Sequence, residues 1–161
     1  MVRMLAALML VVGLQAAAPA GTVVRGRVTL EGERPRERAL KIAPKPGCEA
    51  IPLPKTREDV VVDVAGGLRW AVVRVTRGLG GKRFEVPKEA GRLEVKGHRF
   101  EPRVLGVRVG QELCFVNMDE HPYQVHGLPF KNREFSVSLP KRGMEASHRM
   151  EHEEIFKIQD S

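Results

Sequence analysis

Short runs of alternating apolar and polar residues, separated by glycine, proline and charged residues, make up most of this chain. Stretches with the 3.6-residue period of a helix are almost absent. Strand-like runs at this spacing predict an all-β fold, a sandwich or barrel, rather than an α/β fold. The expected strands are 22–30, 39–42, 59–64, 69–75, 92–95, 104–109, 112–117, 134–139, 146–150 and 155–158.

Alternation within 25–30 and 103–109 places charged side chains on one face and β-branched side chains on the other. We therefore expect both runs to form half-buried strands. The proline-rich stretch 32–55 is expected to be loop-rich, and 78–91 is expected to link two groups of strands. Trp70 opens the run 70–75 and is expected to pack in the interior.

The first twenty residues have the pattern of a secretory signal peptide. Arg3 is followed by the apolar run 5–14 and by small residues that end at Ala20, so we expect cleavage after Ala20. A run of this length is too short to span a membrane, and no later segment is long and apolar enough. The residue directly after the expected cleavage site is Gly21, not the cysteine to which a lipid anchor would be attached. These features predict a periplasmic or secreted protein without a membrane span.

Removal of residues 1–20 would leave 141 residues (161 minus 20), which is enough for one compact domain, with or without a small N-terminal appendage. We divide this part into an N-terminal β region and linker, 21–91, and a core, 92–161. The formal charge of the full chain is +7, which affects solubility and partner attraction but not the fold. With eight aromatic residues and no recognition motif, a nucleic-acid partner is not expected, whereas an exported protein partner is.

The core contains motifs that resemble the plastocyanin-like cupredoxin domains of exported bacterial proteins. These are the stretches 96–111, 113–119, 125–129 and 132–135, together with weaker similarity in the region before them. The resemblance implies a Greek-key β-sandwich with a type 1 copper site, in which two histidines, a cysteine thiolate and an axial methionine hold the metal. Asn117, at the end of a strand, is expected to tie the following ligand loop to the backbone.

Two departures from this family pattern alter the expected copper site. Tyr123 stands where the first ligand histidine is usual, and His121 could replace it only if the loop took another path across Pro122. The chain reaches Ser161 about where the loop with the ligand cysteine, histidine and methionine should begin. We therefore expect a cupredoxin-like sandwich that lacks its final strand, and no blue-copper electron transfer from this chain alone.

The two cysteines, Cys48 and Cys114, would form a disulfide only if their Cα atoms came within about 7 Å. Cys114 alternates with apolar neighbours, so we favour a small buried hydrophobic side chain. His98 stands where the family often has a cysteine, which would leave Cys48 without that partner. Neither cysteine is expected to replace the missing copper ligand.

A second metal hypothesis rests on the soft and borderline ligands in the C-terminal third. The candidate metal ligands are His126, His121, His148, Met150 and His152. On a strand, the last three would share one face, within reach of a Cu(I) or Cu(II) ion. The competing interpretation makes Met150 a core residue and the two histidines exposed neighbours. We expect no resident cofactor. If a cofactor binds, copper is the candidate.

No arrangement of nucleophile and base is recognisable, so we expect no catalysis. Three functions remain open. The first is an exported, non-catalytic binding or structural module with a degenerate type 1 copper site. The second is a copper carrier that uses the His and Met residues. The third is an electron-transfer protein whose missing loop comes from another chain, or whose reading frame is shortened. Loss of the final strand would expose a strand edge that pairs with a partner or with a second copy.

Overall fold

A computed structural model describes residues 25–41, 53 and 55–160. This part of the chain contains seven strands and no helix. The strands are β1 (Gly91–Lys96), β2 (Arg99–Glu101), β3 (Glu112–Asn117), β4 (Tyr123–Leu128), β5 (Phe135–Leu139), β6 (Glu145–Arg149) and β7 (Lys157–Asp160). The expected all-β class is therefore confirmed.

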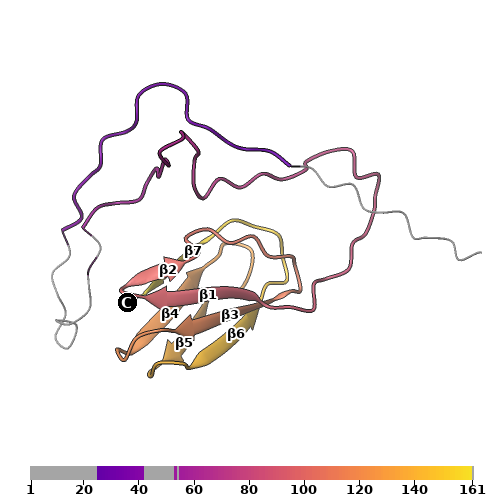
Figure 1. Ribbon diagram of the computed structural model, residues 1–161. Coiled ribbons are helices and arrows are strands. Elements are labelled where there is room, and N and C mark those ends of the chain that lie inside the picture. Colours follow the sequence, from indigo (N-terminus) through magenta and orange to yellow (C-terminus); the bar gives the residue numbers. More distant parts are fainter. Residues whose placement is uncertain (1–24, 42–52, 54, 161) are drawn as a thin grey trace, which may run out of the picture.

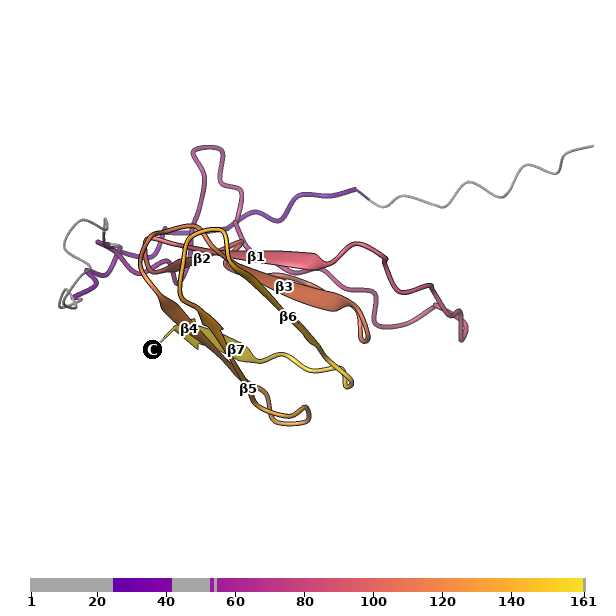
Figure 2. The same cartoon turned by 90° about the horizontal axis from the view of Figure 1, so that it is seen from below.

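The strands form two sheets, which lie as two layers (Figures 1 and 2). One sheet has the order β2-β1-β3-β6, and the other has the order β5-β4-β7. All strand pairs are antiparallel except β1 with β3, which run parallel with Leu93 opposite Phe115. Two facing sheets of this kind are consistent with a β-sandwich.

The core lies between the two sheets and follows the two-residue period of the strands. In β4, Tyr123 and Val125 are buried, whereas Gln124 and His126 between them are only half-buried. The buried apolar cluster consists of Leu93, Val95, Leu113, Phe115, Tyr123, Val125 and Leu139. Each such side chain contributes roughly 1.5–3 kcal/mol by leaving water, so these strands owe their stability to a face that another layer covers.

A glycine in β4 makes room for an aromatic ring. Gly127 is paired with Phe135 of β5, and a Cβ atom at Gly127 would overlap the Phe135 ring. With this space, the ring stacks on His148 of β6 at 4.0 Å between centroids and lies 5.7 Å from the Phe115 ring. The contact joins the two sheets on the side where β5 meets β6.

The strand predictions succeeded mainly in the C-terminal part. The expected runs 92–95, 112–117, 134–139, 146–150 and 155–158 correspond to β1, β3, β5, β6 and β7, the last displaced by two residues. Strands β2 and β4 were not predicted. The run 104–109 forms no strand, although its Leu105 and Val107 pack against the core cluster.

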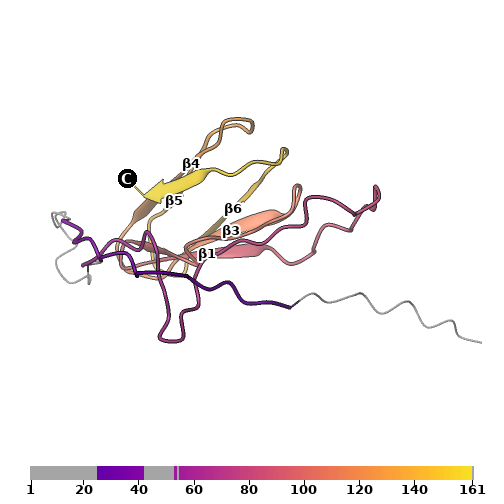
Figure 3. The ribbon, with the colours of Figure 1, turned by 90° about the horizontal axis from the view of Figure 1, so that it is seen from above.

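The predicted strands before residue 91 are wrong where the structure describes them. Of the runs 22–30, 39–42, 59–64 and 69–75, only single bridges form, at Thr29 with Gly67, at Ala39 with Thr56 and at Val62 with Leu68. Many of their apolar side chains are exposed, among them Val64 and Val73, whereas Val61 and Val62 are half-buried. Glu58 in this region accepts a hydrogen bond from Arg99 of β2 at 2.6 Å, but the described N-terminal segments do not join the sheet of β1 and β2 (Figures 1 and 3).

Trp70 does not lie in the interior, contrary to our expectation. It has a positive φ of 64° and is partly exposed, and the Arg69 guanidinium lies 4.9 Å from the centre of its ring. The run 69–75 joins neither sheet, so Trp70 does not point into the core between them. The expected signal peptide, residues 1–20, and Cys48 lie outside the described residues, and no helix in the described part is long and apolar enough to cross a membrane.

Candidate functional site

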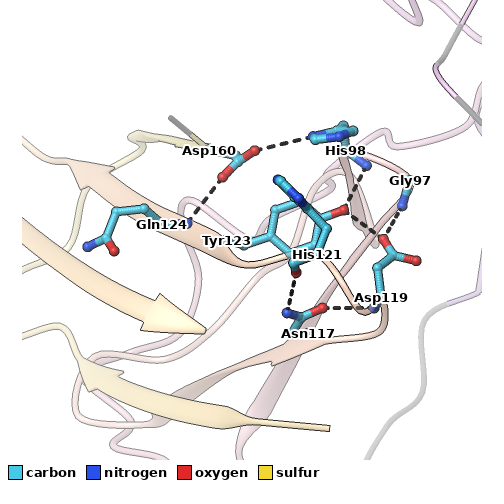
Figure 4. A network of polar contacts seen from close by, with 8 residues as sticks. All are labelled: Gly97, His98, Asn117, Asp119, His121, Tyr123, Gln124 and Asp160. Carbon is cyan, nitrogen blue, oxygen red and sulfur yellow. Dashed lines mark hydrogen bonds and ion pairs between the residues drawn. The ribbon is translucent and has the colours of Figure 1, made fainter. Parts of the chain in front are cut away.

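Tyr123 occupies the centre of the end of the sandwich where the β1–β2 turn, the β3–β4 loop and β7 meet (Figure 4). Its side chain is only 2% exposed. The hydroxyl donates to Asp119 Oδ2 at 2.6 Å and accepts from the backbone N–H of His98 at 3.3 Å. Burial, and then the bond to Asp119, raise the pKa of this phenol, so it stays neutral.

Asn117 holds the loop that precedes Tyr123. It is fully buried at the end of β3, and its Nδ2 donates to the carbonyls of His121 at 2.8 Å and Leu139 at 2.7 Å. Its Oδ1 accepts from the N–H of Asp119 at 2.8 Å. The expectation that Asn117 ties this loop to the backbone is confirmed.

Two imidazoles lie against Tyr123. The rings of His98 and His121 are 5.3 Å apart between centroids, and they lie 5.4 Å and 5.3 Å from the tyrosine ring. His98 has a positive φ of 58°, in the tight turn between β1 and β2. Gly97, before it, donates its N–H to Asp119 Oδ2 at 2.6 Å, so one carboxylate joins this turn to Tyr123.

Asp160 brings the end of β7 into the same cluster. Its Oδ2 lies 3.5 Å from Nδ1 of His98, and its Oδ1 accepts from the N–H of Gln124 at 3.3 Å (Figure 4). The side chains of His98 and Asp160 are 13% and 15% exposed. We call the set of Asn117, Asp119, His121, Tyr123, His98 and Asp160 the Tyr123 cluster. Its polar groups largely satisfy one another, which is the arrangement expected of a structural network.

The chemistry that the contacts of the Tyr123 cluster support is hydrogen bonding. The hydroxyl of Tyr123 is engaged by Asp119 and by the backbone of His98, so this side chain is a protonated phenol held by two hydrogen bonds. Across the part of the chain that the structure describes, no group of three or more His, Cys, Asp or Glu residues has an arrangement that could hold a metal ion.

The five predicted metal ligands fall at separate places. His121 belongs to the Tyr123 cluster, and His126 follows in β4, half-buried on the face opposite Tyr123 and Val125. His148, in β6, stacks on Phe135. Burial lowers the pKa of its imidazole, and the nearby Glu151 carboxylate opposes this effect.

The shared strand face of His148, Met150 and His152 is only partly formed. Strand β6 ends at Arg149, and Met150 directly after it is buried at 4% exposure. His152 lies beyond the strand and is exposed, because the Asn132 side chain accepts the N–H groups of Glu151 and His152 and bends the chain there. The interpretation of Met150 as a core residue is confirmed, and His152 is exposed as that interpretation expected, but it was wrong for His148, which is half-buried against Phe135.

The same bend is held by a carboxylate that caps the β4–β5 loop. Glu154 accepts the backbone N–H groups of Phe130, Lys131 and Asn132 at 2.7, 3.1 and 2.8 Å, and also the Asn132 side chain. Desolvation acts to raise its pKa, but the hydrogen bonds outweigh this effect and lower the pKa to about 2. Glu154 was not singled out from the sequence.

Cys114 is a free, buried cysteine, as expected of a small hydrophobic side chain. Its thiol lies on β3, 3.6 Å from Glu145 Oε2. Burial, and then Glu145, raise the pKa of the thiol, which disfavours the thiolate that a type 1 copper site needs.

Sequence reasoning missed three members of the Tyr123 cluster, namely His98, Asp119 and Asp160. Asp119 stands two residues after Asn117, the position from which a short acidic side chain can cap a turn, and this was the available signal. No protein-family model, curated protein or solved structure matches the chain.

Proposed function

We propose that this chain is an exported, non-catalytic protein with a cupredoxin-like Greek-key sandwich, which acts as a binding or structural module and carries a degenerate type 1 copper position. The observation that carries the proposal is Tyr123. At the place that resembles the first copper ligand, a buried neutral phenol is fixed by Asp119 and by the backbone of His98. A side chain so engaged supports the fold and is poorly suited to bind an ion.

The order of the strands supports the finer fold assignment. The chain passes from β3 to β4, from β5 to β6 and from β6 to β7 by crossing between the two sheets. Such crossings, combined with the β4–β5 hairpin, are typical of Greek-key sandwiches. The motif similarity to plastocyanin-like domains of exported proteins is the further support for export.

Titration of the purified protein with Cu(II) tests this function. We expect no intense thiolate-to-copper absorption at about 600 nm, either in the wild type or in Tyr123→His, because restoring one imidazole supplies no thiolate. Tyr123→Phe is the matched control, since it removes the hydroxyl and adds no ligand. An intense band from the wild-type chain would overturn the proposal.

Copper carriage is the second candidate, and the observation in its favour is the His98–His121 pair. Two imidazoles with ring centroids 5.3 Å apart are close enough to share one ion after small side-chain rotations. In this case Cu(I) would bind tightly to the wild type and weakly to His121→Ala. Loss of binding in the double variant His148→Ala, Met150→Ala instead would place the ion at β6, and loss in His126→Ala would place it on β4.

A further inference from the structure

The two long sides of the sandwich are not alike. On one side, β5 lies against β6 and the sheets meet. On the other side, β7 is an edge strand, paired only with β4 among the described strands. A groove of about 380 Å³ opens there, between Phe156 and Ile158 on one wall and Leu105 and Val107 on the other.

The floor of this groove is part of the hydrophobic core. Leu93 and Leu113 are 4% and 3% exposed, and both line it. An edge strand beside an apolar groove is the arrangement that accepts an added strand, since the backbone pairs with the edge while alternate side chains enter the groove. We call this surface, β7 with the groove, the acceptor edge.

A segment of the same chain has the complementary properties. Residues 71–76 form no strand, and Val72, Val73 and Val75 are 64%, 82% and 64% exposed. In an extended conformation Val73 and Val75 share one face. We call residues 71–76 the donor segment. A β-branched run so exposed is an unusual feature of an isolated soluble chain.

The charges near the two surfaces also favour contact between the donor segment and the acceptor edge. The donor segment and its flanks carry Arg69, Arg74 and Arg77, with no acidic residue between them. The bend before the acceptor edge carries Glu151, Glu153 and Glu154. Within one chain, Arg74 Nη1 already lies 3.1 Å from Glu153 Oε1, and Val72 lies at the wall of the groove. The single chain thus brings the two together but leaves Val73 and Val75 uncovered, and the outer edge of β7 has no strand partner among the described strands.

We propose that the partner of the acceptor edge is a second copy of this chain, whose donor segment adds to β7 as a fourth strand. Val73 and Val75 of the added strand fill the groove, and its Arg74 takes the place of the same-chain Arg74 at Glu153. The exchange is reciprocal, so it closes with two-fold symmetry and produces a dimer. This inference rests on the proposed role as a binding module and assigns that role its surface.

The oligomeric state of the full chain, measured by analytical ultracentrifugation over a range of concentrations, tests the proposal. We expect a concentration-dependent dimer for the wild type. The double variant Val73→Glu, Val75→Glu should weaken it more than tenfold, because two charges would enter an apolar groove. These residues are exposed in the monomer, so circular dichroism should show an unchanged fold. Val64→Glu, at a residue that is 99% exposed, is the matched control and should dimerise like the wild type.

A charge-exchange pair identifies the partner segments. Arg74→Glu alone and Glu153→Arg alone should each weaken the dimer by about tenfold, because like charges then face each other at both contacts. An equimolar mixture of the two variants should recover a heterodimer, since opposite charges meet again at both contacts. If the donor segment paired with β7 of its own chain, the wild type and all variants would be monomers. If β7 paired with β7 of a second copy, the Val73→Glu, Val75→Glu variant would still form the dimer.

A monomeric wild type, a dimer indifferent to the valine variant, or a mixture without recovery would each overturn the proposal. The copper titration gives its result for monomer and dimer alike. Failure of the dimer and failure of the proposed function are therefore distinguishable.

Discussion

Residues 91–160 and the described residues between 25 and 90 both contain valine-rich alternating runs, but of these two parts only the first buries them. Val95 and Val125 are fully buried, whereas Val64 and Val73 are 99% and 82% exposed. The local pattern is similar in the two regions. What differs is the presence of a second sheet at the distance where side chains interdigitate. Residues with high strand propensity therefore form strands where two layers pack together, and they form only isolated β-bridges where the second layer is missing.

The largest effect should come from truncating the interior. Phe115→Ala removes a fully buried ring between the sheets and should lower the free energy of unfolding by about 3–5 kcal/mol. Val64→Ala, in the N-terminal region, should change it by less than about 0.5 kcal/mol. Urea denaturation monitored by circular dichroism measures both. Comparable losses in the two variants would contradict the contrast between the regions.

The next effect concerns the buried polar group that fixes the Tyr123 cluster. Asn117→Ala leaves the buried carbonyl of Leu139 without its side-chain donor and frees the β3–β4 loop. We expect a loss of about 2–3 kcal/mol in the free energy of unfolding. Ser138→Ala, at an exposed position of β5, is the control and should be nearly neutral. A neutral result for Asn117→Ala would mean that the loop is held by other contacts.

A smaller, pH-dependent effect should mark His148 as an interior residue. Its pKa is lowered in the folded protein, so below the ordinary value of about 6.5 the unfolded chain takes up the proton first. Its contribution to stability is complete above this pH and is lost as the pH falls through the folded pKa. The matched variant is His148→Phe, which keeps a ring against Phe135. On acidification, the free energy of unfolding of the wild type should therefore fall relative to that of this variant. A difference independent of pH would show that His148 is solvated.

The smallest effect is expected in the N-terminal region. Arg27 and Asp63 form an ion pair at 2.9 Å, but their side chains are 54% and 47% exposed. Arg27→Ala should lower the free energy of unfolding by no more than about 1 kcal/mol, because solvent screens such pairs. Asp63 would keep its bonds from the N–H groups of Ala65 and Gly67. A loss above this range, in the same urea experiment, would show that this region is coupled to the sandwich.

The sequence was sufficient for the all-β class and for the strands whose alternation coincides with a covered face. Strand β3 was predicted with its observed bounds because apolar residues, two turn signals and Asn117 all mark it. Strand β4 was missed because Tyr123 and His126 resembled part of a ligand loop, although the buried Tyr123 and Val125 alternate with the polar Gln124 and His126. The exposed run 69–75 was overpredicted, since periodicity does not reveal whether a second layer is present.

The candidate site was predictable only in its local parts. The role of Asn117 followed from turn chemistry, whereas the burial of Tyr123 and its bonds to Asp119 and His98 were not predicted. His98 and Asp160 are 62 residues apart in the chain, and they meet only because β7 runs antiparallel to β4 while the β1–β2 turn lies at the same end. Such a contact depends on topology, which no local pattern contains.

The fit of the Phe135 ring over Gly127 has an evolutionary consequence. Any descendant that gains a side chain at position 127 must shrink residue 135, and the loss of that ring would leave the His148 imidazole without its stacking partner. Positions 127, 135 and 148 should therefore change together among homologous chains, although each lies on a different strand.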